Sequence, residues 1–470
     1  MNYSDFDVLF ERAGGKRYKA LVLNSPAGQA AVDFRRPFSE LELENFLLKI
    51  GRPRRTGRRG DSPLMQNVKT FGQRLFETVF DGEVRGCFRS SLDEATRQEA
   101  GLRLRLRMTN TPELADLPWE YLYNPALNHF LATSKATPVV RYLDLPERIR
   151  PLRVKPPLKV LTMISSPKDY AALAVEKEWT KLNQALDDLK RRNLVALERL
   201  DNATLEALQK RLRQNEYHIF HFIGHGEFDK HNRDGVLIFE DDNEKGVALP
   251  GQNLGTLLHD ARTLRLVLLN ACEGARGSRS DPFSGTAQSL VQQGIPAVIA
   301  MQFEISDDAA IIFAQEFYAA IADGHPIDMA LSETRQTILV KGNEIEWAAP
   351  VLYMRAPDGR IFDLAEKPPP PPDNDGFAQL YQAQVRLSLL FYLNDTSRMH
   401  EGLSIADIRE KLGIEKRKDV FAALEELAKQ QFIDKIRKGK KVSWRISERG
   451  RGVLQKLSEL IKTRIETLAR

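Results

Sequence analysis

Apolar runs of strand length alternate with helical patterns between residues 158 and 354. The runs hold few polar positions, as expected of strands buried on both faces of a sheet. Strands are expected at Leu158–Ile164, Val195–Leu200, Tyr217–Ile223, Leu264–Leu269, Pro296–Met301 and Pro350–Met354. Helices are expected at Val175–Arg191, Thr204–Gln214, Gly251–His259, Gly285–Gln293, Asp307–Ala322 and Asp328–Val340. This alternation predicts an α/β fold with a parallel-rich sheet flanked by helices on both faces.

The clearest boundary in the chain is the run of five prolines at Pro368–Pro372. Such a run cannot be a helix or a central strand, and it favours a stiff polyproline II spacer. A softer seam lies at Arg150–Pro157, where three prolines precede an apolar run. We therefore expect an accessory part over residues 1–150, the α/β domain over 151–365, a linker over 366–376 and a second small domain over 377–470.

Composition is that of an ordinary globular protein, with 42% apolar and 28% charged residues among 470. No apolar run approaches the ~18 residues that a membrane span requires. The first fifteen residues include Asp5, Asp7 and Glu11, which is unlike a signal peptide. The two cysteines, Cys87 and Cys272, are too few for a disulfide framework and favour a reducing cytoplasm. We expect no metal and no cofactor.

Two of the predicted parallel strands end in reactive side chains. Tyr217–Ile223 leads into Gly224, His225 and Gly226, and Leu264–Leu269 leads into Asn270, Ala271 and Cys272. Parallel strands place their carboxyl ends at one sheet edge, where sites form. A His about 50 residues before a Cys is the caspase arrangement, and here the spacing is 47 residues. The pair predicts a nucleophile, Cys272, with His225 as its base, and an oxyanion site made by the amides of Gly226 and Cys272.

Structural roles compete with this interpretation. A lone Cys after a buried strand is usually a small core residue, and a lone His is usually a hydrogen-bonded structural residue. The two glycines beside His225 favour chemistry, because they permit a tight turn and close approach of a substrate backbone. His218 and His221 lie inside the strand and are interpreted as core residues or residues that support the site.

Three motifs resemble the CHAT family of caspase-like, separase-related peptidases. They are Tyr217–Phe228 (YHIFHFIGHGEF), Asn270–Ala275 (NACEGA) and Met301–Gly324. The likeness extends upstream through Phe71–Phe88, Leu117–Pro125 and Pro138–Tyr142, and covers essentially residues 1–365. The resemblance implies a caspase-like fold and assigns the family's His-Gly to His225 and Gly226 and its nucleophile to Cys272. The tetratricopeptide array common in this family is absent.

The segment Glu304–Asp307 resembles the acidic stretch by which separases recognise a basic residue before the scissile bond. Asp307 is the first candidate for this substrate-binding role and Glu304 the second. An alternative remains, because Asp307 also suits the first turn of the helix that Ser306 would cap.

The tail carries the basic charge of the chain. From Gly376 onward it has 20 Lys and Arg against 12 Asp and Glu, a net charge of about +8. The whole sequence has a net charge of +5, so the residues before Gly376 carry about −3. A helix at 385–393, a helix–turn–helix at 405–430, strands at 432–436 and 442–446 and a last helix at 447–467 together resemble a winged helix, a small α+β domain. Nucleic acid would then contact Lys416, Arg417, Lys418, Lys438, Lys440 and Lys441. The alternative is a protein-docking or dimerisation module with a solvated basic face.

The sequence therefore predicts a cytoplasmic cysteine endopeptidase that cleaves a specific protein partner. The family resemblance implies a bacterial defence or programmed-cell-death pathway, with the winged helix and an unknown activating partner as regulators. The competing hypothesis is a catalytically silent CHAT-fold adaptor or a nucleic-acid-binding regulator.

Overall fold

The computed structural model describes residues 1–50, 62–147, 149–229, 234–271, 282–364, 393, 417–429, 431–438, 441–449 and 451. The chain divides into two compact units, Met1–Pro368 and Pro369–Arg470. The predicted linker, the nucleophile Cys272 and the predicted helices at 385–393 and 405–412 lie outside the described residues, apart from Leu393.

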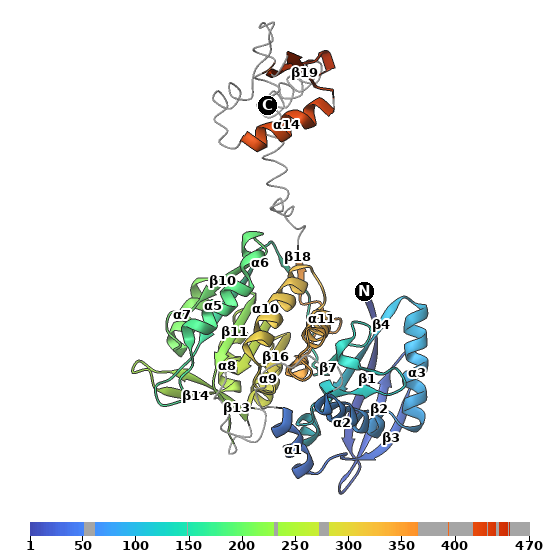
Figure 1. Ribbon diagram of the computed structural model, residues 1–470. Helices are drawn as coiled ribbons and strands as arrows, with labels where there is room; N and C mark the ends of the chain where they lie inside the picture. The colour runs from blue at the N-terminus through green and yellow to red at the C-terminus, as the bar shows by residue number, and fades with distance from the viewer. Residues whose placement is uncertain are drawn as a thin grey trace. The chain divides into compact units, whose positions relative to one another are not determined.

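An 11-stranded sheet is the framework of the described part of the first unit (Figure 1). Its strand order is β10-β9-β11-β15-β16-β17-β7-β4-β1-β2-β3. The strands are β1 (Asn2–Arg12), β2 (Arg17–Asn24), β3 (Ala30–Arg35), β4 (Ala100–Arg107), β7 (Val139–Tyr142), β9 (Leu158–Ile164), β10 (Val195–Arg199), β11 (Ile219–Gly224), β15 (Leu266–Ala271), β16 (Ala297–Met301) and β17 (Pro350–Met354).

The sheet consists of two parallel blocks that point in opposite directions. Strands β10, β9, β11, β15 and β16 are parallel neighbours, and β17, β7, β4 and β1 form the second block. The blocks meet where β16 pairs with β17 in antiparallel fashion, and β2 and β3 extend the far edge as antiparallel strands. All six predicted strands are confirmed, and so is the α/β fold with a parallel-rich sheet.

Helices cover both faces, as the apolar strands require. Along β11, Ile219 and Ile223 pack with α5 and α10, whereas Phe220 and Phe222 face the core formed with α7, α8 and α9. The α-helices of this unit are α1 (Glu40–Ile50), α2 (Pro63–Val79), α3 (Gly82–Arg97), α4 (Pro112–Ala115), α5 (Val175–Ala185), α6 (Asp187–Arg191), α7 (Leu205–Gln214), α8 (Gly251–His259), α9 (Pro282–Gln292), α10 (Asp307–Ala322) and α11 (Ile327–Val340). Short 3-10 helices are η1 (Trp119–Tyr121), η2 (Leu131–Thr133) and η3 (Glu346–Ala348).

Helix ends follow the local chemistry of the sequence. The hydroxyl of Ser306 accepts from the amide of Ala309 at the start of α10, and Gly324 beyond its end has a φ of +82°. The predicted helix at 175–191 is two helices, α5 and α6, which meet at Leu186.

Three small sheets of this unit were not predicted. One is the antiparallel sheet β12 (Gly226–Asp229), β13 (Asp234–Glu240) and β14 (Gly246–Pro250), which directly follows His225. The others pair β5 (Tyr123–Asn124) with β6 (His129–Phe130), and β8 (Leu152–Val154) with β18 (Phe362–Leu364). The turn-rich segment after His225 is therefore a folded extension of the site.

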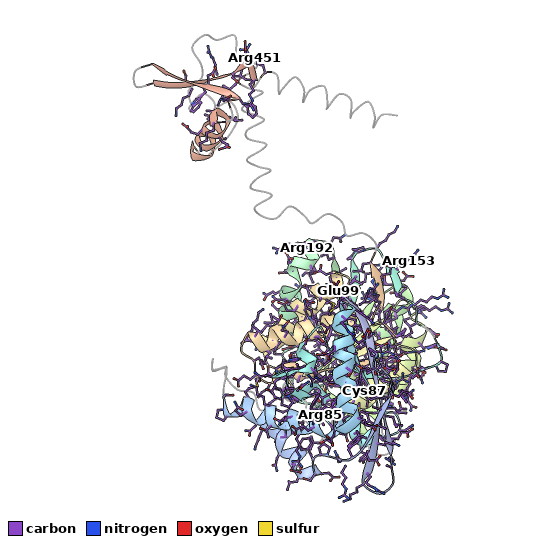
Figure 2. All side chains as sticks on the ribbon, turned by 90° about the vertical axis from the view of Figure 1, so that its right-hand side faces the viewer. Arg85, Cys87, Glu99, Arg153, Arg192 and Arg451 are labelled. Atoms are coloured by element: carbon purple, nitrogen blue, oxygen red, sulfur yellow. The ribbon has the colours of Figure 1, made fainter. Side chains whose placement is uncertain are left out.

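Residues 1–150 share the sheet with residues 151–365. Strand β7 from the first segment pairs with β17 from the second, so one layer of strands crosses the predicted seam. Helix α3 packs against β3 and β4 and carries Cys87, whose buried thiol lies 3.2 Å from the hydroxyl oxygen of Ser25 (Figure 2). Cys87 is thus a core residue of the N-terminal segment.

The described part of the second unit is one helix followed by a hairpin. Helix α14 (Arg417–Lys429) precedes β19 (Ile433–Lys438) and β20 (Lys441–Ile446), which pair antiparallel. Leu424, Leu427, Ile433, Trp444 and Ile446 are buried. The predicted helix and hairpin are confirmed, whereas the complete winged helix stays a prediction.

Two absences concern the described residues. None of their helices is both long enough and apolar enough to cross a membrane. No group of three or more His, Cys, Asp and Glu side chains among them could hold a metal ion.

Candidate active site

The register of two central strands brings the residues just before the predicted catalytic positions side by side at one edge of the sheet. In the parallel pair β11 and β15, Ile223 is opposite Asn270 and Gly224 is opposite Ala271. His225 and Cys272 are the next residues of their strands along the chain. Cys272 itself lies outside the described residues, but one peptide unit, ~3.8 Å between Cα atoms, joins it to Ala271.

The imidazole of His225 is held by a main-chain carbonyl. His225 is 2% exposed, and its Nε2 lies 2.8 Å from the carbonyl oxygen of Ala171. A carbonyl oxygen only accepts, so Nε2 carries the hydrogen and donates it. In the neutral ring this leaves the lone pair on Nδ1. The side chain is therefore fixed in the tautomer that can accept a proton at Nδ1.

Ala171 belongs to the connecting segment between β9 and α5, residues 165–174, which is tied to the small sheet behind His225. The amide of Ser166 donates to Glu240 at 2.6 Å, and Asp169 accepts from the amide of Gly246 at 2.7 Å. The ring of Tyr170 lies 5.4 Å from that of His225. Because several elements hold this segment, the carbonyl of Ala171 is a fixed acceptor. No side-chain pattern in the sequence could have revealed it, since the functional group is backbone.

The glycines beside His225 have a packing role that was not predicted. Neither Gly224 nor Gly226 has a positive φ. A Cβ on Gly226 would lie 2.5 Å from the ring of Phe283 on α9, and one on Gly224 would lie 2.7 Å from the ring of Phe222. Glycine is required at these positions because aromatic rings occupy the space of a side chain.

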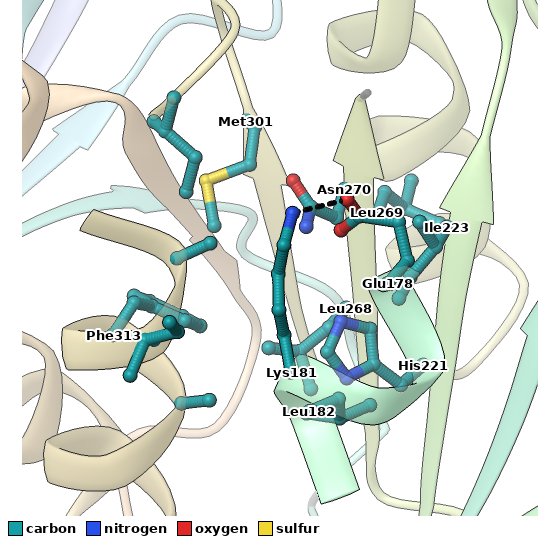
Figure 3. Close-up of a pocket in the computed structure, with 14 residues that line it drawn as sticks. Glu178, Lys181, Leu182, His221, Ile223, Leu268, Leu269, Asn270, Met301 and Phe313 are labelled. Atoms are coloured by element: carbon teal, nitrogen blue, oxygen red, sulfur yellow. Dashed lines mark hydrogen bonds and ion pairs between the residues drawn. The ribbon is translucent and has the colours of Figure 1, made fainter. Parts of the chain in front are cut away.

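A hollow lies beside Asn270, between the sheet and helices α5 and α10 (Figure 3). Leu182, Leu268, Met301, Phe313 and Ala314 are among its apolar lining residues. Its polar lining residues are Glu178, Lys181, His221 and Asn270. The side-chain oxygen of Asn270 is buried and accepts no hydrogen bond from the part of the chain that the structure describes. Hence an unsatisfied acceptor lies two residues before Cys272.

The two predicted substrate-binding acids lie near this hollow on the loop and helix after β16. Asp307 begins α10, and its half-exposed carboxylate pairs with Lys177 at 2.8 Å and with Lys181, both from α5. These lysines and the side-chain hydrogen bonds they donate lower the pKa of Asp307 below its usual value. Glu304 lies between β16 and α10 and also has an interaction partner. The spacing of residues in the sequence could not predict that Asp307 pairs with Lys177 and Lys181.

His218 and His221 are buried in or beside β11, in agreement with the sequence interpretation. Nδ1 of His218 accepts from the amide of Lys159 at 2.9 Å, and Nδ1 of His221 lies 3.0 Å from the hydroxyl of Tyr318. Burial lowers the pKa of each to about 4, helped at His218 by the charge of Lys159. Both are therefore neutral at pH 7.

The predicted nucleic-acid residues fall at two places in the second unit. Arg417 and Lys418 begin α14, and Lys438 and Lys441 are the last and first residues of the hairpin strands. Lys416 and Lys440 lie outside the described residues. A nucleic-acid contact stays a prediction.

Comparisons with known proteins give a family and several similar structures. Solved structures similar to this chain include separase of Saccharomyces cerevisiae in complex with securin, at 15% identity and a TM-score of 0.32, covering 60% of this chain and 17% of that one. The Drosophila initiator caspase Dronc is similar at 13% identity and a TM-score of 0.25, covering 43% of this chain and 87% of that one. No curated protein matches the chain. The model of the CHAT domain matches residues 69–355, and the chain belongs to the CHAT domain family.

Proposed function

We propose that this protein is a cysteine endopeptidase in which Cys272 is the nucleophile and His225 the base. The register of β11 and β15 supports it, because Gly224 pairs with Ala271 and the two reactive residues follow immediately. A core cysteine and a structural histidine would not need this coincidence. The hydrogen bond from His225 to Ala171 adds support, since it leaves Nδ1 free of a proton.

The chemistry proceeds in two steps. Nδ1 of His225 takes the proton of the Cys272 thiol, and the thiolate forms a C–S bond with the scissile carbonyl carbon. The imidazolium returns that proton to the departing amine as the C–N bond breaks. Water then attacks the thioester, again with His225 as base, and releases the carboxylic acid and the thiol. The amides of Gly226 and Cys272 would stabilise the oxyanion of both tetrahedral intermediates.

The substrate in this proposal is a protein partner cut after a basic residue. Asp307 and Glu304 follow β16, the strand beside β15, and supply negative charge near the hollow at Asn270. A Lys or Arg side chain would find charge-assisted acceptors there. We place the reaction in regulated proteolysis, in a defence or cell-death setting, with the second unit as the regulatory part.

A thiol-reactive peptide probe with arginine at its reactive end tests the proposal. It should label the wild type, and Cys272→Ala should abolish labelling and peptide cleavage without unfolding the protein. His225→Ala should reduce both at least ~100-fold, the range expected for loss of a general base. Cys87→Ala is the matched control, because that thiol is buried on α3, and it should label like the wild type. Labelling or cleavage that persists in Cys272→Ala would exclude the mechanism, and a folded wild type that never reacts would favour a silent adaptor.

A further inference from the structure

Helix α5 presents two lysines to one carboxylate at the start of α10. Nζ of Lys177 lies 2.8 Å from Asp307, and Lys181 contacts the same carboxylate from the next turn of the helix. Lys181 also donates to Glu178 at 2.6 Å, and its side chain is only 13% exposed. The side chains of Asp307 and Glu178 thus enclose one ammonium group between two acids.

This ammonium group lies at the hollow beside Asn270, which precedes the proposed nucleophile by two residues in the sequence. Figure 3 shows Lys181 extending from α5 toward Asn270, with the dashed bond to Glu178 at its tip and Met301 across the space. The wall below is apolar and consists of Leu182, Leu268 and Phe313. The side-chain oxygen of Asn270, another lining residue, is buried and accepts no hydrogen bond from the residues that the structure describes. An aliphatic stem with a cationic tip therefore matches the lining of this hollow.

We propose that Lys181, supported by Lys177, is an internal substitute for the basic side chain of a substrate. It neutralises Asp307 and Glu178 while the site is empty, and a substrate Lys or Arg displaces it and takes over both acids. Asn270 then accepts a hydrogen bond from the same substrate residue. This inference rests on the proposed function for its chemistry, but its binding step requires no reaction.

Displacement can begin at Asp307, whose ion pair with Lys177 is partly exposed, whereas the pair of Lys181 with Glu178 is largely buried. The side chain of Asp307 is 48% exposed and that of Lys177 is 64% exposed, so solvent screens their pair. Pairs of this kind are weak enough for a better-placed guanidinium to replace them, since its planar fork binds a carboxylate through two bonds. The lysines lower the affinity for every basic ligand and leave the affinity for neutral ligands unchanged. Removing them should strengthen binding of a basic ligand roughly three- to tenfold.

Two small ligands that differ only in charge measure this competition. Acetyl-arginine methylamide and acetyl-citrulline methylamide are titrated by ligand-observed NMR into the full-length protein. The double variant Lys177→Ala/Lys181→Ala should bind the arginine ligand three- to tenfold more tightly and the citrulline ligand as the wild type does. Lys181→Arg, which keeps the cation, should behave like the wild type. Lys190→Ala removes a lysine that pairs with Asp187 on the neighbouring helix α6, and it should change neither affinity.

The outcomes separate this inference from the proposed function. Asp307→Asn should reduce the preference for arginine over citrulline, and Asp307→Asn/Glu178→Gln should abolish it, because Lys181 pairs with both acids. Adding the two lysine changes to this double variant should have no further effect. If the double lysine variant binds arginine no better than the wild type, or binds both ligands equally better, the inference is wrong. If the ligand results hold but Cys272 reacts with no probe, the proposed peptidase activity fails while the cation site stands.

Discussion

Adding one methyl group at Gly226 should disturb the packing behind the proposed catalytic histidine. A Cβ there would lie 2.5 Å from one ring carbon of Phe283 and 3.0 Å from two others, and Phe283 is fully buried. Real Cβ atoms do not approach so closely, so α9 or β12 must shift. Overpacking of this size typically costs about 1–3 kcal/mol, and we expect Gly226→Ala to lower the free energy of unfolding by that amount.

Guanidinium unfolding of the full chain, followed by tryptophan fluorescence, measures the effect. Phe283→Leu should make room for the new methyl group, so the loss in the double variant should be at least ~0.5 kcal/mol smaller than the sum of the single losses. Gly86→Ala on the exposed surface of α3 is the matched control. Its Cβ meets nothing within 4 Å, and it should be neutral or stabilise by up to about 1 kcal/mol.

The same variant discriminates between two roles for the glycine. Alanine retains the amide hydrogen, so the proposed oxyanion donor is still present in Gly226→Ala. If Gly226 serves packing, stability falls and Phe283→Leu restores part of it. If Gly226→Ala is as stable as the wild type but inactive, or if the two losses add fully, the packing explanation is refuted and close approach of a substrate becomes the better reason for glycine.

Two further predictions concern pH and salt. His221 has a folded-state pKa of about 4 against 6.5 for the free side chain, so the unfolded chain binds the extra proton and stability is lost as pH falls below 6.5. Between pH 7 and pH 5, the free energy of unfolding of His221→Gln should fall by about 2 kcal/mol less than that of the wild type, as measured by denaturant unfolding at both pH values. An equal fall in the two proteins would contradict this. The fragment 376–470 should bind duplex DNA with an affinity that falls steeply with salt, and changing Lys438, Lys440 and Lys441 to Glu should flatten the slope in an anisotropy titration. Absence of binding at low salt would favour a protein-docking tail.

Sequence patterns predicted the part of the fold in which each strand is buried on both faces. Runs such as Leu158–Ile164 and Pro350–Met354 have the same bounds in the structure, because continuous apolar runs between turns leave little choice of element. The direction of a strand could not be predicted from its apolar pattern. The apolar pattern of Pro350–Met354 is identical for either direction, and its antiparallel pairing with β16 is set by where α11 returns the chain. Likewise, the pairing of β17 with β7 joins residues about 210 positions apart, which no local pattern encodes.

Some features of the candidate site could likewise be predicted from the sequence, and others could not. The sequence could predict that the strands before His225 and Cys272 are buried, and the structure shows that these strands are parallel neighbours, whereas the catalytic roles of the two residues stay a prediction. Ala171 could not be predicted, because its contribution is a carbonyl group that every residue possesses. The pairing of Lys181 with Asp307 could not be predicted either, since it joins two helices 126 residues apart through flexible side chains. A helix first-turn acid and a substrate-binding acid look the same in sequence, and at Asp307 the neighbouring lysines mean that the two roles are not exclusive. The carboxylate that favours the start of α10 is held by cations that a basic substrate could replace.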